Sequence, residues 1–379
     1  MKIVVAIDSF KGSLSSFKAG NAVKESIIKL DPTANVVVKS IADGGEGTVD
    51  ALAAELGSEI IKTKVKGPLL EEVEAKYCIL NDKTAVIEMA EASGLTLVPL
   101  DKRNPMHTTT YGVGQIIKDA VEKGCRNFII GIGGSATNDG GVGMLSALGF
   151  EFFDESHNLL ETSASGLENL AYIDANNVIS ELKECKFRIA SDVNNPLCGE
   201  NGCSHIFARQ KGATDEEIEL MDQWLLKYGD ICNTYFGTDY TDYPGAGAAG
   251  GLGYAFMTFL NAKLESGVKI ILEEIGLEKD IMDADIVVTG EGRLDAQTIM
   301  GKAPIGVSKL AKKYNKTVIA FCGCASDDAK ICNEHGIDAY FSVLQSVTSL
   351  EEAMDKDNAY KNLIDTAMQV FRLIIIRRQ

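Results

Sequence analysis

The sequence predicts an α/β protein of two domains, in which both chain ends build a Rossmann-like domain with a parallel sheet. Strand–loop–helix units open the chain and return after residue 285, which is the order typical of parallel sheets covered by helices. Between them, residues 58–90 alternate apolar and polar side chains between turn residues, which indicates an antiparallel meander. With 379 residues the chain is long enough for two cores. The predicted domains are 1–60 plus 285–379, and an inserted mixed α/β domain over 61–284.

Short apolar runs and amphipathic segments define the elements of the Rossmann-like domain. The apolar runs are short and rich in β-branched residues, which favours buried strands. Because parallel strands end at the same edge of a sheet, we expect the loops that follow them to converge there. The expected strands are 2–7, 36–38, 285–288 and 318–321, with helices over 16–30, 49–56, 304–313 and 328–335.

A glycine-rich loop over 131–141 is the most informative stretch of the inserted domain. It follows an apolar run over 127–130 and precedes an expected helix over 142–148. Glycines allow a ligand to approach the main chain, and N–H groups at a helix start attract anions. The loop therefore favours anion binding, with a tight strand–helix turn as the alternative. A second glycine-rich stretch over 244–253 opens an expected apolar helix over 254–260.

The composition excludes several classes of function. A net charge of −17 argues against a protein that wraps nucleic acid. We expect no signal segment and no membrane span, because the apolar runs are too short. Nine cysteines, an odd number, fit reduced thiols better than a disulfide framework. The four histidines are widely spaced, so a histidine metal site or a protease-like triad is not expected.

Carboxylates lie beside glycines in four of the loops that are expected to follow strands. Such acids bind Mg²⁺ or act as a general base, and cations beside them neutralise phosphate or a substrate carboxylate. Asp139 and Asp215 are better explained as helix caps. The candidates are the acids Asp8, Asp43, Glu46, Asp192, Glu291 and Asp295, with the cations Lys11, Lys211, Arg293 and Lys302.

Two segments match the glycine pattern of dinucleotide-binding loops. Residues 131–136 fit it after an expected strand, and residues 245–250 fit it without one. Two matches in one chain show how little specificity the pattern has. A Walker-type phosphate loop is absent, because Lys302 is followed by Ala303, and the protein-kinase motifs are absent too. Any phosphoryl transfer must use a different phosphate-binding loop.

Seven blocks of sequence together resemble the bacterial type 1 glycerate kinase family. They occur in the family's order and span nearly the whole chain, and several are long and unusual. One departure is Ile7, where many members have proline. The blocks are DSFKGS at 8–13, ADGGEGT at 42–48, GGSATNDGG at 133–141, SDVNNPL at 191–197, QKGA at 210–213, PGAGAAGG at 244–251, and TGEGRLDAQT at 289–298 with GKAP at 301–304.

The resemblance implies phosphorylation of D-glycerate by ATP, with Mg²⁺, in the cytoplasm. It implies 2-phosphoglycerate as the product, and two α/β domains with the site between them. The C2 position rests on the resemblance alone. We expect ATP phosphates to lie against glycine-rich backbone and a carboxylate to accept the hydroxyl proton. The expected site residues are Asp192, Asp43 and Lys11 for catalysis, Arg293, Asp295, Ser9 and Asp8 for glycerate, Gly133, Gly134, Ser135, Gly247, Gly250, Gly251 and Lys302 for ATP, and Asp43, Glu46 and Glu291 for metal.

Asp192 is the first choice as the base, with Asp43 or Asp295 as substitutes, and Arg293 is expected to clamp the glycerate carboxylate. Two other functions remain open at this point. One is an NAD(P)-dependent oxidoreductase for hydroxy acids, which leaves the acid-rich loops unexplained. The other is a sensor that binds a small acid without turnover. We expect no nucleic-acid or membrane partner, and either a homodimer or a monomer.

Overall fold

The computed structural model describes residues 1–377, and the chain folds into two compact units. The first unit is built from Met1–Asp43, Asp50–Gly57 and the chain from Val268 onward. The second unit is built from Gly44–Val49 and Ser58–Gly267. Residues 268–284, which the sequence assigned to the inserted domain, therefore pack with the first unit. The short segment 44–49 packs with the second.

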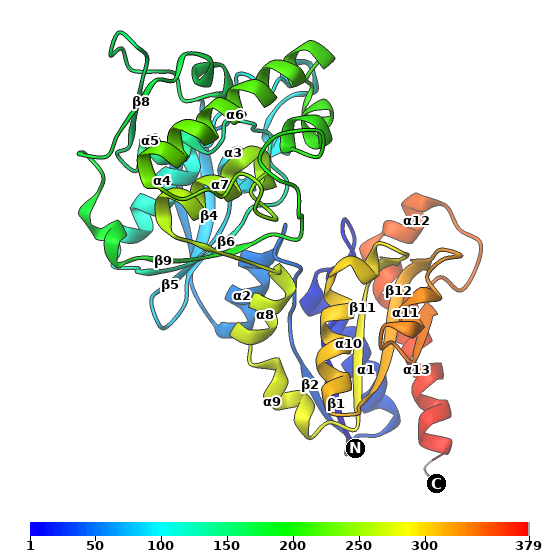
Figure 1. Ribbon diagram of the computed structural model, residues 1–379. Helices are drawn as coiled ribbons and strands as arrows, with labels where there is room; N and C mark the ends of the chain where they lie inside the picture. The colour runs from blue at the N-terminus through cyan, green and yellow to red at the C-terminus, as the bar shows by residue number, and fades with distance from the viewer. Residues whose placement is uncertain (378–379) are drawn as a thin grey trace. The chain divides into compact units, whose positions relative to one another are not determined.

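A parallel five-stranded sheet forms the centre of the first unit, in the order β13-β12-β11-β1-β2 (Figure 1). Strand β1 pairs with β11 and β2, so that Ile3 lies between Ile286 and Val36. Each strand follows a helix or irregular connection rather than a hairpin, as parallel pairing requires. The strands are β1 (Lys2–Val5), β2 (Asn35–Val38), β11 (Ile286–Leu294), β12 (Thr317–Ala325) and β13 (Ala339–Ser342).

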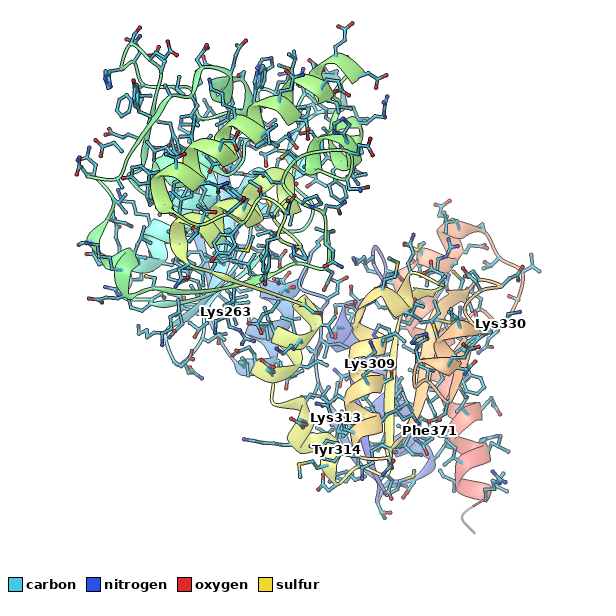
Figure 2. The ribbon with its side chains drawn as sticks, in the orientation of Figure 1. Lys263, Lys309, Lys313, Tyr314, Lys330 and Phe371 are labelled. Atoms are coloured by element: carbon cyan, nitrogen blue, oxygen red, sulfur yellow. The ribbon has the colours of Figure 1, made fainter. Side chains whose placement is uncertain are left out.

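Helices of the first unit bury one apolar side against this sheet. Helix α1 (Ser16–Leu30) begins where the Ser15 hydroxyl accepts the Lys18 N–H, and it packs on α13 (Lys356–Ile376). Phe371 of α13 is fully buried in the shared core (Figure 2). The other helices are α8 (Gly267–Glu274), α9 (Leu277–Met282), α10 (Ala303–Lys313), α11 (Ile331–Glu334) and α12 (Leu350–Met354), with the single-turn η7 (Thr298–Met300), while α2 (Thr48–Leu56) spans the boundary of the two units.

The second unit contains a mixed sheet in the order β10-β9-β6-β5-β4-β3 (Figure 1). Strands β3, β4 and β5 form the antiparallel meander, while β5, β6, β9 and β10 run parallel. The last residues of the parallel strands lie side by side, because Gly131 pairs with both Glu88 and Ala190, and Ala190 pairs with Glu265. The strands are β3 (Ile60–Lys66), β4 (Glu72–Ile79), β5 (Thr84–Glu88), β6 (Asn127–Gly131), β9 (Lys186–Ala190) and β10 (Lys263–Glu265).

Helices and a small two-stranded antiparallel sheet complete the second unit. Helix α6 (Asp215–Phe236) has a capping box at Thr214 and Glu217. The N-cap is therefore Thr214 and not Asp215, which is the first helical residue, because the Thr214 hydroxyl accepts the Glu217 N–H. A turn of π-helix, η5 (Ser204–Ala208), and the single-turn η6 (Arg209–Lys211) precede it. The remaining elements are α3 (Ala90–Ser93), η1 (Leu95–Leu97), η2 (Leu100–Lys102), α4 (Tyr111–Glu122), α5 (Val142–Ala147), β7 (Glu151–Phe153), η3 (Ala164–Asn169), β8 (Tyr172–Asp174), η4 (Ser180–Glu184) and α7 (Ala248–Leu260).

The predicted fold class is confirmed, with a parallel-sheet unit that contains residues from both ends of the sequence and a mixed α/β unit. One local difference affects the site. Strand β11 continues to Leu294, so Glu291 and Arg293 lie in the strand and not in a following loop. Gly290 makes this possible, since a Cβ there would collide with the Phe321 carbonyl oxygen of β12. Within residues 1–377, no helix is both long and apolar enough to cross a membrane.

Candidate active site

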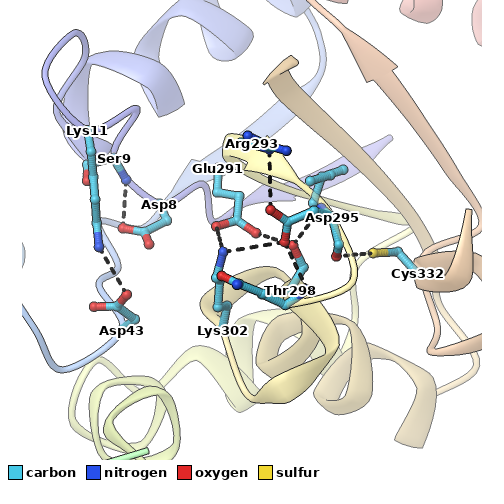
Figure 3. Close-up of polar contacts among 12 residues, drawn as sticks. Asp8, Ser9, Lys11, Asp43, Glu291, Arg293, Asp295, Thr298, Lys302 and Cys332 are labelled. Carbon is cyan, nitrogen blue, oxygen red and sulfur yellow. Dashed lines mark hydrogen bonds and ion pairs between the residues drawn. The ribbon is translucent and has the colours of Figure 1, made fainter. Parts of the chain in front are cut away.

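Charged side chains gather at the carboxyl edge of the first sheet (Figure 3). Asp8 follows β1, and its N–H donates to the Gly290 carbonyl, which aligns it with β11. Lys11 comes from the same loop, and its Nζ lies 3.4 Å from an Asp43 carboxylate oxygen. The structure thus brings together, within one unit, five predicted residues that come from three separate blocks of the sequence. They are Asp8, Lys11, Asp43, Glu291 and Asp295.

Asp8 is nearly buried, with 5% of its surface exposed. Its Oδ1 accepts a hydrogen bond from the Ser9 N–H at 2.7 Å. Burial, helped by the negative charge of Asp43, raises the pKa of Asp8 to about 7. Burial opposes a charge on Lys11, but the carboxylates of Asp43 and Asp8 outweigh it and raise the pKa of Lys11. Asp8 therefore exchanges its proton near neutral pH, beside a lysine that stays charged.

A second group of contacts surrounds Glu291. Its Oε1 accepts the Thr298 hydroxyl at 2.7 Å, and its Oε2 lies 3.5 Å from the Lys302 Nζ. Lys302 also lies 3.9 Å from an Asp295 carboxylate oxygen. Burial raises the pKa of Glu291, while Thr298 and Lys302 act in the opposite direction. Lys302 is thus held between two acids at the sheet edge, with a third of its side chain exposed.

Arg293 and Asp295 complete this edge. The Arg293 Nε lies 3.3 Å from Asp295 Oδ2, but about two thirds of the arginine side chain is exposed. A surface pair of this kind adds little to stability. The guanidinium therefore keeps donors that can bind a planar carboxylate in a bidentate manner.

The glycine-rich loop of the second unit lies at the carboxyl end of β6. Gly133 and Gly134 are exposed, and Ser135 is half-buried. Behind them lies Lys211, whose Nζ donates to the Ser135 Oγ at 2.9 Å and to the Thr137 carbonyl at 2.7 Å. Lys211 is buried, with 3% of its surface exposed, and burial lowers its pKa to about 8. The sequence indicated Lys211 as a candidate cation, but it did not predict that this side chain is buried.

Asp139 is fully buried in the same loop, and it organises the start of the following helix. Its carboxylate accepts the N–H of Gly141 and Gly143, and both the N–H and the hydroxyl of Thr110. Burial raises the pKa of Asp139, and these donors oppose that shift. The helix start is thus occupied by a protein carboxylate. Donors for an external anion must come from residues 133–135 instead.

The second glycine-rich stretch packs directly on the first. The Gly140 N–H donates to the Gly250 carbonyl, and a Cβ at Gly250 would collide with the Thr137 carbonyl oxygen. Gly247 meets the backbone of Pro196 in the same way. Gly247, Gly250 and Gly251 are all buried, so close backbone packing accounts for them. Direct contact of these three with ATP stays a prediction.

Asp192 and Glu46 were predicted for the same site as the charged residues of the first unit. Both belong to the second unit, and both are exposed. Asp192 follows β9, and the Ser191 N–H donates to the Glu265 carbonyl of β10, so Asp192 is at the same sheet edge as the loop 131–141. The role of Asp192 as the base and the role of Glu46 as a metal ligand stay predictions.

The acids at the edge of the first sheet fit a magnesium ion that is held chiefly by a substrate. Carboxylate oxygens are the ligands that Mg²⁺ prefers, and the ion usually takes only one or two of them together with phosphate oxygens and water. In the part of the chain that the structure describes, no three His, Cys, Asp or Glu side chains are placed to hold a metal by themselves. Asp43 and Glu291 are the predicted ligands within this unit.

One sheet edge carries paired acids and cations, and the other carries exposed glycine backbone over a buried lysine. These groups are typical of an enzyme that binds small anions and transfers protons and phosphoryl groups. The comparisons with known proteins give the family. A sequence profile described as "Glycerate kinase family" matches residues 3–375. The chain belongs to the glycerate kinase family, and the resemblance predicted from the sequence blocks is confirmed.

Relatives from several bacteria agree along nearly their whole length. The chain is 46% identical to "Glycerate 2-kinase" of Escherichia coli, covering 99% of this chain and 98% of the relative. It is 45% identical to "Glycerate kinase" of Bacillus subtilis, covering 95% and 94%. A crystal structure of a Salmonella typhimurium protein that carries the name glycerate kinase 2 superposes with a TM-score of 0.91 at 42% identity, covering 100% of this chain and 99% of that one.

Proposed function

We propose that this protein transfers the γ-phosphoryl group of ATP to the C2 hydroxyl of D-glycerate. The observation that carries the proposal is the buried Asp8 carboxyl, with the charge of Lys11 acting on it and Lys302 paired with Glu291 at the same sheet edge, in a chain of the glycerate kinase family. Phosphoryl transfer needs little covalent chemistry from the protein and much positioning and charge neutralisation. This edge supplies both a proton acceptor and cations. The C2 position is supported by the name of the Escherichia coli relative.

The proton of the reacting hydroxyl goes to a carboxylate, and Asp8 is the strongest candidate that the structure adds. A group whose pKa is about 7 is partly ionised at neutral pH and still basic enough to accept a proton. The sequence placed Asp8 among the glycerate ligands, because burial after a strand cannot be measured from residue types. Asp192 remains the base proposed from sequence, with Asp43 and Asp295 as substitutes.

Glycerate is bound through its carboxylate in this proposal. Arg293 offers the exposed guanidinium for a bidentate contact, and Lys11 and Ser9 add donors from the loop after β1. Asp295 orients Arg293 at 3.3 Å. Together these residues fix the hydroxyl-bearing carbon, which is how positioning lowers the barrier.

The phosphates of ATP are assigned to exposed backbone and to cations. Gly133, Gly134 and Ser135 offer N–H and hydroxyl donors in the second unit, and Lys302 offers charge in the first. A Mg²⁺ ion held by Asp43, Glu291 and Glu46, together with phosphate oxygens, would neutralise charge that develops during transfer. Gly247, Gly250 and Gly251 support the loop from behind.

The test is phosphorus NMR of the product made from D-glycerate and ATP. We expect ADP and a monophosphate resonance coupled to the C2 proton. The same reaction with NAD⁺ in place of ATP should leave the absorbance at the nicotinamide wavelength unchanged, whereas the oxidoreductase alternative requires it to rise. Ligand binding without ADP release would favour a sensor.

The choice between the bases is tested with Asp192→Asn and Asp8→Asn. Turnover of Asp192→Asn within tenfold of wild type removes Asp192 from the base role. Gel filtration with light scattering distinguishes the homodimer from the monomer, and the cytoplasmic location stays a prediction.

A further inference from the structure

The contact between Lys211 and Ser135 joins a buried cation to a half-buried hydroxyl. Lys211 lies at the end of η6, directly after the π-helical turn η5. π-Helical turns are rare and occur often at functional sites. Gly212 then takes φ 104°, where a Cβ would collide with the Arg103 carbonyl oxygen. This irregular backbone directs the Lys211 side chain into the protein and against the loop 131–141.

The charge on Lys211 has few compensating groups. Cys203 and Asp139 are the titratable groups that act on it from neighbouring elements, and both favour its charged form. Burial also raises the pKa of Cys203 to about 12, so this thiol stays neutral. A buried lysine costs stability unless it is paired or has a task. Its two hydrogen bonds go to neutral oxygens, of Ser135 and Thr137.

The protonation of Lys211 fixes the direction of the Ser135 hydroxyl. An ammonium group has three donors and no acceptor, so Ser135 Oγ must accept from it. The Ser135 proton then points elsewhere. In the described part of the chain, this hydroxyl and the N–H groups of Gly133, Gly134 and Ser135 find no acceptor. Consecutive N–H donors beside a positive φ, here 75° at Gly134, form the kind of concavity that binds anions.

A second observation indicates an absent ligand. The Thr137 Oγ1 is fully buried and has no hydrogen-bond partner within residues 1–377. Buried hydroxyls are nearly always satisfied, by protein, water or ligand. Thr137 lies two residues after Ser135, and its carbonyl accepts from the same Lys211 ammonium. Unpaired donors thus occur within residues 133–137, and the buried Lys211 ammonium group contacts the same segment.

We propose that Lys211 is a positioning residue that holds the Ser135 hydroxyl as a donor toward a phosphate group of the nucleotide. The inference rests on the proposed function, because it identifies the anion with ATP. Lys211 itself stays buried and acts through Ser135, while Ser135 and the N–H groups of residues 133–135 touch the phosphate. The positive charge behind the hydroxyl strengthens its hydrogen bond to an anion.

The proton on Lys211 makes the contact dependent on pH. Below about pH 8 the side chain is an ammonium and Ser135 must donate outward. Above that pH the neutral amine has a lone pair that can accept the Ser135 proton, which withdraws the donor from the phosphate. Affinity for ATP should therefore fall as the pH rises through about 8. Cys203 keeps its proton in that range, because burial raises its pKa to about 12. Burial also raises the pKa of Asp139, and the hydrogen bonds from Thr110, Gly141 and Gly143 oppose that shift.

The experiment measures binding of ATP and of inorganic tripolyphosphate by calorimetry, together with kcat and the KM for each substrate. The variants are Lys211→Met, Ser135→Ala, the double variant and Ser135→Thr. We expect each single removal to weaken ATP binding about tenfold or more, since hydrogen bonds to charged groups are the strong ones. The double variant should be no weaker than either single variant. Ser135→Thr keeps a hydroxyl and should retain most of the affinity.

Lys227→Met is the matched control, because this exposed lysine of the same unit also donates to a backbone carbonyl, that of Glu168. It should leave affinity and its pH dependence at wild-type values. Ser135→Ala should bind ATP weakly at every pH from 7 to 9.5, without the loss near pH 8. If Lys211→Met does not fold, the pH dependence of wild type, Ser135→Ala and Ser135→Thr decides the question alone.

Three results would overturn the inference. Additive losses in the double variant would show that Lys211 and Ser135 act independently. A pH dependence that persists in Ser135→Ala would place it elsewhere. Weakened D-glycerate binding with unchanged tripolyphosphate binding would assign the donors to a carboxylate. If wild type forms no ADP with D-glycerate, the proposed function fails, but tripolyphosphate binding still tests the phosphate site.

Discussion

The carboxyl edges of the two sheets hold anion-binding groups of different kinds. At the first edge the groups are side chains, with Asp8, Glu291 and Lys302 in contact with charged neighbours. At the second edge they are exposed backbone at Gly133 and Gly134, with Lys211 buried behind them. In our proposal, the same topological position serves proton transfer in one unit and anion binding by backbone N–H groups in the other. Substitutions should separate the two: side-chain changes should alter proton transfer at the first edge, whereas changes at the second edge should alter ATP binding or stability.

The largest effect is expected for Asp8→Asn. Loss of the proton acceptor should lower kcat by about 10²–10⁴-fold, the usual contribution of a general base. Steady-state kinetics with D-glycerate and ATP measure it. Asp31→Asn is the control, because this carboxylate of the same unit accepts hydrogen bonds from the N–H and the hydroxyl of Thr33 at the end of α1. A kcat within a factor of ten of wild type would contradict the assignment and return the role to Asp192.

Asp139→Ala should instead act on stability. Four donors lose their acceptor in a fully buried place, which lowers the free energy of unfolding by about 3–5 kcal/mol. Denaturant unfolding followed by circular dichroism measures the change. Asp8→Asn, in contrast, should be at least as stable as wild type at pH 8, since it removes a buried charge with few donors. Equal losses of stability in Asp139→Ala and Asp8→Asn would contradict the proposed difference between the two sheet edges.

Substitutions at two glycines distinguish a role in backbone packing from a contact with the ligand. Gly250 has φ 69° and touches the Thr137 backbone, so Gly250→Ala should cost about 1–3 kcal/mol. Gly133 has open space, with only the Gly45 Cα at 3.8 Å from an added Cβ. Gly133→Ala should keep wild-type thermal stability and raise the KM for ATP. An unchanged KM for ATP in a stable Gly133→Ala protein would move the phosphate away from this loop.

Arg293→Lys should have a moderate effect. A lysine keeps the charge but not the planar pair of donors, so the KM for D-glycerate should rise about tenfold with kcat nearly unchanged. Little stability should be lost, because the Arg293 contact with Asp295 is largely exposed. Kinetics with D-glycerate varied at saturating ATP provide the measurement. A change in the KM for ATP alone would reassign the guanidinium to the nucleotide.

The smallest effect is a pH dependence that follows Asp8. The rate at low D-glycerate should fall as the pH drops below about 7, because a protonated Asp8 cannot accept a proton. Stability should change in the opposite sense. The pKa of Asp8 is raised in the folded protein, so the unfolded chain holds fewer protons between about pH 4 and 7, and stability falls as the pH rises through that window. Rates that stay constant from pH 5.5 to 7.5 would exclude Asp8 as the base.

The sequence predicted β1, β2, β11 and β12 and several helices because their apolar periods are clear, as in α1, which was placed at residues 16–30. It did not predict the edge strands β10 and β13. It missed the length of β11, since Gly290 and Gly292 look like a loop until the neighbouring Phe321 carbonyl is seen. It also did not define the extent of α13, the long helix over Lys356–Ile376. The charged residues proposed for the site were selected from their residue types and their positions beside glycines. The burial of Asp8 and Lys211, which gives them their chemistry, depends on contacts between distant segments.

The pairing of β1 has a consequence for synthesis. Ile3 pairs with Val36 on one side and with Ile286 on the other, about 280 residues later. At about 5–20 residues per second, β1 waits roughly 15 to 60 s on the ribosome for this neighbour. The strands of the second unit all lie between residues 60 and 265. We expect released chains that are truncated near residue 275 to protect the second unit from protease while the first unit is still cleaved. The unit with the exposed glycine loop then completes its fold before the acid-rich unit has joined its central strands.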